Sequence, residues 1–112
     1  MPSIVAMQVA GPAGECLYFT MESGDRATSI LPPPSGFVGR TFIVVAAGKE
    51  GDFEAMRQWY VDRFGLRGRP IRQSQVAVVQ HAQGLDPDRA IPLTTVGLQQ
   101  HGNLIELDGY PV

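Results

Sequence analysis

This chain of 112 residues contains a single cysteine, a single lysine and no cluster of basic residues. The lone Cys16 excludes an internal disulfide and a cysteine-rich metal site, and this cysteine usage is typical of a reducing cytoplasm. Since free cysteines usually serve as packing material, we expect Cys16 to pack within a strand. The nine basic residues are spread from Arg26 to Arg89, and the formal net charge is -2. Nucleic acid is therefore not an expected partner.

Long apolar runs are also absent from the sequence. The first apolar stretch stops at Gln8 without a basic leader, so we expect no secretory signal. No segment approaches the roughly 18 apolar residues that a membrane span requires. The hydrophobic and charged fractions, 44% and 18%, are those of a globular protein with one core. We expect a soluble cytoplasmic protein with no membrane partner.

The first third of the chain predicts a hairpin followed by a linker. Residues 4–9 and 15–20 read as strands around the turn-forming residues 11–14. Residues 23–39 are rich in glycine, serine and proline and include three successive prolines. Because such a run suits neither a helix nor a central strand, we predict a semi-rigid, extended linker there.

The next segment predicts a strand and then an amphipathic helix. Residues 41–47 are rich in β-branched side chains and favour a largely buried strand. Between Asp52, the predicted N-cap, and Gly65, the predicted C-terminal stop, the period changes to that of a helix. The apolar face of this helix is predicted to carry Phe53, Met56, Tyr60 and Phe64.

The last third predicts three further elements. Residues 66–72 could form a short strand, at an edge or irregular because of Gly68 and Pro70. Residues 75–83 favour a helix capped by Ser74 and ended by Gly84, with a strand as the competing interpretation. Residues 93–99 and 103–108 then form a final hairpin around 100–102.

The two predicted hairpins repeat each other at a spacing of 88 residues. Residues 14–20 align with 102–108, glycine on glycine and apolar on apolar, and Tyr18 falls on Glu106. Two copies of one structural unit would explain this pattern. A chance match between two glycine-turn hairpins is the alternative.

The chain resembles the vicinal oxygen chelate superfamily in its order of elements, in the stretch "WYVDRFGL" at residues 59–66 and in the motif "IEL" at residues 105–107. This superfamily includes glyoxalase I, bleomycin-resistance proteins and extradiol dioxygenases. The resemblance implies an α+β fold built from βαβββ modules whose curved, mixed sheets pair around a cavity. Residues 40–112 would be one complete module, residues 1–22 the last two strands of a preceding module, and 23–39 the linker. Open sheet edges would then be completed in a homodimer, or the chain would be a piece of a two-module protein.

Glu106 is the main candidate functional residue. Strand alternation places Leu104, Glu106 and Asp108 on one side of the last strand, and Ile105 and Leu107 on the other. By the resemblance, Glu106 corresponds to a cavity glutamate that binds a divalent metal and takes part in catalysis. Leu104 and Asp108 would line the same cavity. Tyr18, at the matching position of the partial module, would also line it.

A complete metal site is not evident from the sequence. Zinc, iron, manganese or nickel would ordinarily take at least three N or O ligands, and residues 41–44 provide no histidine or glutamate. His81 is expected on the protein surface and His101 in a solvated turn. One divalent metal and no metal therefore both remain open. Glu106 could be a metal ligand, a metal-free cavity carboxylate or a solvated strand residue.

These observations leave three hypotheses about function. The assembled protein could be a metal-dependent lyase, isomerase or dioxygenase that holds two adjacent substrate oxygens. It could instead be a non-catalytic protein that sequesters a small molecule in a cavity, using Tyr18 or Trp59. The third hypothesis is a fragment without activity of its own.

Overall fold

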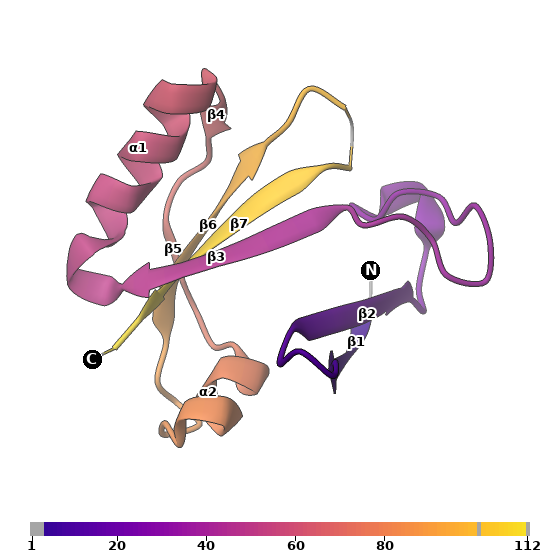
Figure 1. Ribbon diagram of the computed structural model, residues 1–112. Coiled ribbons are helices and arrows are strands. Elements are labelled where there is room, and N and C mark those ends of the chain that lie inside the picture. Colours follow the sequence, from indigo (N-terminus) through magenta and orange to yellow (C-terminus); the bar gives the residue numbers. More distant parts are fainter. Residues whose placement is uncertain (1–3, 101, 112) are drawn as a thin grey trace. The chain divides into compact units, whose positions relative to one another are not determined.

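The structure, a computed structural model, describes residues 4–100 and 102–111. The chain divides into two compact units, Met1–Pro32 and Pro33–Val112, which are described separately below (Figure 1).

The N-terminal unit is a β-hairpin followed by one short helical turn. Strand β1 spans Ile4–Ala10 and pairs antiparallel with β2, Cys16–Glu22. Gly14 in the connecting turn has a φ of 81°, a conformation that glycine adopts at low cost. The predicted hairpin is confirmed, with β2 starting one residue later and ending two residues later than expected. The predicted linker is not extended throughout, because Arg26–Thr28 form a 3-10 helix. Cys16 is exposed, so its predicted packing role is wrong.

The C-terminal unit is a mixed five-stranded sheet with two α-helices. Its strand order is β3-β7-β6-β4, and β5 also pairs with β6. Strand β3 runs parallel to β7, while the pairs of β6 with β4, β5 and β7 are antiparallel. The elements in chain order are β3 (Ile43–Lys49), α1 (Phe53–Phe64), β4 (Arg67–Gly68), β5 (Arg72–Ser74), α2 (Ala77–Gln83), β6 (Ile91–Gly97) and β7 (Leu104–Tyr110). The predicted α+β class is confirmed.

The helix boundaries agree with the sequence at their C-terminal ends and less well at their N-terminal ends. Gly65 and Gly84 both end their helices in the left-handed conformation, with φ of 60° and 62°. Asp52 makes no capping hydrogen bond, because it belongs to a 3-10 turn that leads directly into α1. The N-cap of α2 is Val76 rather than Ser74, which pairs with β6 as the last residue of β5.

One apolar cluster holds α1 against the sheet. Phe53 of α1, Val96 of β6 and Leu107 of β7 are its buried centre. Partly buried side chains complete it: Ala46, Met56, Tyr60, Leu66 and Ile105. Phe64, at the end of the predicted apolar face, stacks on Tyr60 but is 57% exposed and lies outside the cluster. The helical period continues to Phe64, but the sheet beneath that turn does not bury it.

The packing of α1 decides which way β7 faces. Ile105 and Leu107 contact the helix cluster, as the sequence predicts. Gly109 continues the same side of β7, and a Cβ atom there would lie 3.1 Å from Phe53 and 2.6 Å from Pro92. Because successive strand residues alternate, Leu104, Glu106 and Asp108 face the side of the sheet opposite α1.

The two hairpins also match in structure. Strands β2 and β7 both contain seven residues and begin 88 positions apart. The pair Gln8 and Tyr18 of the first hairpin corresponds to the pair Thr95 and Glu106 of the second. The turn glycines Gly14 and Gly102 have φ values of 81° and 78°. The antiparallel pairing and the turn conformation are therefore repeated, but the offset is 88 residues on β7 and 87 on β6, because the loop of the second hairpin is one residue longer.

A β-bulge separates β4 from β5. Gly68 pairs with Val96 and Arg72 pairs with Leu93, so residues 69–71 lie opposite only Thr94 and Thr95. The Thr94 hydroxyl donates to the Arg69 carbonyl at 2.9 Å, and the Arg69 N–H donates to the Thr95 carbonyl at 3.3 Å. The irregular strand that the sequence predicts over 66–72 is this bulged pair of short strands.

Both α-helices are short. Within the described residues, α1 and α2 contain twelve and seven residues, and neither could cross a lipid bilayer.

The core predicts the effect of truncating Leu107. Leu107→Ala removes a fully buried side chain between Phe53 and Val96 and should lower the free energy of unfolding by about 2–5 kcal/mol. Urea denaturation followed by circular dichroism measures this change. Leu98→Ala is the matched control, because Leu98 is 41% exposed and its truncation should change stability by no more than about 0.5 kcal/mol. Equal effects of the two substitutions would contradict the assigned core.

Candidate functional site

Two carboxyl groups lie side by side on the central strand of the sheet. Glu106 pairs with Thr95 on β6 and with Val45 on β3, and Asp108 pairs with Leu93 on β6. Residues directly opposite on paired strands present their side chains to the same face. We call this the carboxylate face, and its members are Val45, Leu93, Thr95, Leu104, Glu106 and Asp108.

Asp108 is the more buried of the two acids. Its side chain is 2% exposed, and its Oδ1 atom has no hydrogen-bond partner among the described residues. Burial raises the pKa of Asp108 to about 7, and the nearby charge of Glu106 adds to this increase. Near neutral pH the group therefore exchanges between a carboxylic acid, which donates a hydrogen bond, and a carboxylate, which accepts one.

Glu106 lies in a mixed environment. Burial raises its pKa, and the positive charge of Arg72 opposes this increase. The bulge explains why Arg72 is there. If the register of β4 continued unbroken, Arg72 would lie opposite Pro92, on the side facing α1. The extra residue in the bulge instead places Arg72 opposite Leu93, on the carboxylate face.

A pocket of about 240 Å³ lies at the bulge, close to Glu106. It is lined by Arg69, Pro70, Arg72 and Thr95. Its members come from the bulge, from β5 and from β6, and Thr95 is the cross-strand partner of Glu106. The pocket and the two carboxyl groups therefore belong to one face of the sheet.

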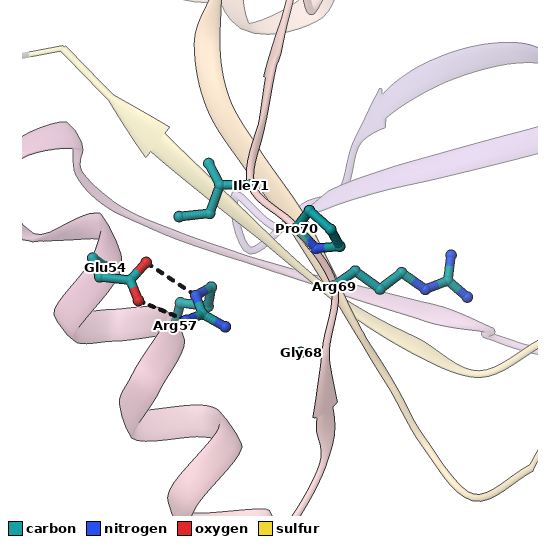
Figure 2. A pocket seen from close by; sticks show the side chains of 6 residues that line it. All are labelled: Glu54, Arg57, Gly68, Arg69, Pro70 and Ile71. Atoms are coloured by element: carbon teal, nitrogen blue, oxygen red, sulfur yellow. Dashed lines mark hydrogen bonds and ion pairs between the residues drawn. The ribbon is translucent and has the colours of Figure 1, made fainter.

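A second pocket, of about 320 Å³, lies between α1 and residues 68–71 (Figure 2). Here Arg57 forms an ion pair with Glu54, with 2.6 Å between Nη2 and Oε1. Gly68 makes room for this arrangement, because a Cβ atom there would lie 2.7 Å from the Arg57 guanidinium. Figure 2 shows that the side chain of Arg69 points away from the Glu54–Arg57 pair. The Glu54 and Arg57 side chains of this second pocket are already paired with each other.

The described residues do not fit a metal ion. Among them, no three His, Cys, Asp or Glu side chains are grouped so that they could hold one. Glu106 and Asp108 provide two carboxyl groups, and the positive charge of Arg72 beside Glu106 opposes a bound cation. His81 is exposed on α2, and His101 lies outside the described residues.

The other predicted site residues fall in different places. Leu104 is buried on the carboxylate face. Tyr18 belongs to the N-terminal unit, where the Gln8 amide donates to its hydroxyl at 3.2 Å. Trp59 is exposed on α1, where its ring meets Tyr60 edge-on. Because α1 packs on the opposite face of the sheet, Trp59 does not line a cavity with Glu106.

Sequence reasoning missed Arg69, Arg72 and Thr95. The only signal for the two arginines was Gly68 and Pro70, which suggested an irregular strand without giving its register. Thr95 is recognisable only once its pairing with Glu106 is known.

Comparison of the chain with family models, with curated proteins and with solved structures found no significant match.

The raised pKa of Asp108 predicts a pH-dependent stability. The folded state holds the proton of Asp108 up to about pH 7, whereas an unfolded aspartate loses it near 3.8. The stabilisation from this proton is complete below 3.8 and is lost as the pH rises towards 7. Asp108→Asn removes the ionisation, so at pH 8 the variant should be more stable than the wild type, by on the order of 2–4 kcal/mol. Near pH 4 the two proteins should be similarly stable.

Urea denaturation at several pH values between 4 and 8 measures this difference. Asp62→Asn, on the exposed surface of α1, is the control and should shift stability by no more than about 0.5 kcal/mol at any pH. A second variant, Glu106→Gln, should lower the pKa of Asp108 measured by carbon-13 NMR, because it removes a neighbouring negative charge. A wild-type stability advantage at pH 8 would contradict the assigned environment of Asp108.

Proposed function

We propose that this chain is a small-molecule-binding protein of the vicinal oxygen chelate type, with residues 40–112 as one complete βαβββ module. The observation that carries the proposal is the placement of Glu106 and Asp108 on the central strand, on the face opposite the helix. A ligand on this face would meet acidic groups surrounded by apolar side chains, a combination typical of small-molecule sites.

The strand arrangement supports the family assignment. A strand, a helix and then further strands follow in chain order, with the short helix α2 inserted between β5 and β6, and the first strand lies parallel to the last. The helix packs on one face of this sheet. In a βαβββ module of the proposed family, the cavity glutamate belongs to the last strand, which is the strand of Glu106.

The repeated antiparallel hairpin, with a left-handed glycine in each turn, supports the assignment of the N-terminal hairpin to a preceding module. Strands β1 and β2 pair as β6 and β7 do, and Tyr18 takes the position of Glu106. By this correspondence, the side of the hairpin that carries Met7 and Phe19 matches the side of β6 and β7 that packs on α1. In the hairpin this side is exposed and entirely apolar, comprising Val5, Met7, Val9, Leu17, Phe19 and Met21.

An exposed apolar sheet face of this kind needs a cover. We therefore propose that two copies of the chain associate as a homodimer through this side of the hairpin. The lone Cys16 is consistent with a reducing cytoplasm as the location of the assembled protein.

Binding without a metal is the version of the function that the residues of this chain favour. The proposed ligand forms a hydrogen bond to Glu106 directly, and the apolar neighbours Val45, Leu93 and Leu104 exclude water. A metal-dependent lyase, isomerase or dioxygenase is the second candidate, favoured by the cavity-strand glutamate alone. It would require ligands beyond those that the described residues provide.

The homodimer predicts a mass of two chains in multi-angle light scattering. Met7→Glu places a charge on the apolar side of the hairpin and should shift the population towards the monomer, because burying an unpaired carboxylate is costly. Gln8→Glu is the matched control, since the neighbouring residue faces the other side of β1. A monomeric wild-type mass, or equal effects of the two substitutions, would contradict this mode of association.

The proposed site predicts that Glu106 contributes to the binding of catechol, a probe with two adjacent hydroxyl donors. Amide NMR shifts should change along β6 and β7, and Glu106→Gln should weaken binding about tenfold through loss of a charged hydrogen-bond acceptor. Glu54→Gln, on the opposite side of the sheet, is the control and should leave the affinity unchanged. Shifts confined to α1 would contradict the proposed site.

Elemental analysis tests the metal-dependent candidate. The protein is equilibrated with zinc, manganese or nickel and then dialysed. Under the metal-free proposal, the retained metal should be well below one ion per chain and should be the same in Glu106→Ala and Glu54→Ala. One ion per chain that is lost only in Glu106→Ala would favour the enzyme instead.

A further inference from the structure

Two arginines line the pocket beside the carboxylate face, and their guanidinium groups have hydrogen-bond donors to spare, although the charge of Arg72 is felt by Glu106. Among the described residues, neither the Arg69 nor the Arg72 side chain forms an ion pair or a hydrogen bond. The other arginines that face acidic groups behave differently, since Arg57 is paired with Glu54 and Arg89 with Glu50. Pocket-lining guanidiniums with unused donors are suited to a planar or tetrahedral oxyanion.

The bulge holds these two arginines in place. Arg69 is fixed through its backbone, which donates to the Thr95 carbonyl and accepts from the Thr94 hydroxyl. Arg72 is fixed by its pairing with Leu93. Figure 2 shows the Arg69 side chain directed away from the ion pair on α1. Two cations that would repel each other are thus both held at one pocket by the hydrogen bonding of β6.

The walls of the pocket restrict what can bind there. A volume of about 240 Å³ is below the range of roughly 300–1,000 Å³ that is typical of pockets for drug-sized ligands. Thr95 contributes a hydroxyl that can donate to an anion, and Pro70 contributes an apolar wall. The negative charge of nearby Glu106 repels an anion. Only the side of the pocket lined by the arginines is therefore favourable to negative charge.

We propose that Arg69, Arg72 and Thr95 form an anion subsite that binds the carboxylate or phosphate end of a small metabolite. The subsite deepens the proposed function, on which its biological meaning rests, because it orients a ligand with its anionic end at the arginines. The remainder of the ligand then extends along the sheet towards Glu106 and Asp108. The ligand class is a small organic acid or phosphate ester that also carries a polar group at its other end.

NMR titration of the full chain with pyruvate, methyl pyruvate and inorganic phosphate tests the subsite. Methyl pyruvate keeps the oxo group and lacks the negative charge. We expect pyruvate or phosphate to produce saturable shifts at the Arg69 and Arg72 side chains and at Thr95, and methyl pyruvate to produce none there. The tighter of the two anions identifies the carboxylate or the phosphate as the preferred end.

The double variant Arg69→Gln/Arg72→Gln should weaken anion binding at least tenfold. Both side chains are at exposed positions, so the fold should persist, which the amide spectrum checks directly. Arg63→Gln/Arg67→Gln is the matched control, because it removes the same charge from two exposed arginines that do not line the pocket. Affinity similar to the wild type is expected for this control.

Three results would overturn the subsite. These are the absence of saturable binding of both anions, binding that survives in the Arg69/Arg72 variant, and equal losses in the two double variants. The catechol titration is independent of these outcomes, since catechol is neutral. Loss of the catechol result alone would overturn the proposed function and leave the anion subsite standing.

Discussion

The packing of Leu107 between Phe53 and Val96 is the contact on which the rest of the C-terminal unit depends. It places β7 in the middle of the sheet and directs one side of that strand to α1. Because side chains alternate along a strand, the other side of β7 must then carry Glu106 and Asp108. The carboxylate face is in this sense a geometric consequence of the core. A shift of one residue in the register of β7 would bury the acids under the helix and expose the leucine.

Placing two acids on a sheet face has an electrostatic cost that the structure meets in two ways. Asp108, with a pKa of about 7, is protonated for part of the time at neutral pH, which reduces the repulsion between it and Glu106. Arg72 supplies an opposite charge close to Glu106. The second solution depends on the bulge between β4 and β5. Without the extra residue, the same sequence would direct Arg72 towards α1, and Glu106 would lose this neighbouring positive charge.

The two hairpins show how one pattern can have different surroundings. Both pair antiparallel and have a left-handed glycine in the turn. In the second hairpin, α1 covers the apolar side. In the first, the matching apolar side is exposed, which is why we propose association of two chains. The internal repeat thus carries information that neither hairpin provides alone, because it indicates which side of the first hairpin requires a covering element.

The sequence by itself determined those secondary-structure elements and strand faces that follow from the periodicity of apolar residues. A strand before α1, helix α1 itself, its stop at Gly65 and both hairpins follow from local patterns, because residues close in sequence decide them. The strand runs over Ile43–Lys49 rather than 41–47, and its predicted burial is wrong, because none of its residues is buried. The direction of Glu106 followed from alternation. The helix starts were predicted less well, since the 3-10 turn before α1 and the pairing of Ser74 with Ile91 displaced Asp52 and Ser74 from their expected capping roles.

Only the tertiary structure decided the chemistry around Glu106. The position of Arg72 depends on a register with β6 that joins residues more than twenty positions apart, and no local pattern encodes it. The pKa of Asp108 depends on its burial, and the burial of a single polar residue cannot be predicted from the sequence. Cys16 was predicted to be packed and is exposed, and Phe64 lies on the predicted apolar face of α1 and is also exposed, because a local apolar pattern does not say whether another element lies against it. Periodicity determines the face that a side chain occupies, and long-range packing determines what that face contacts.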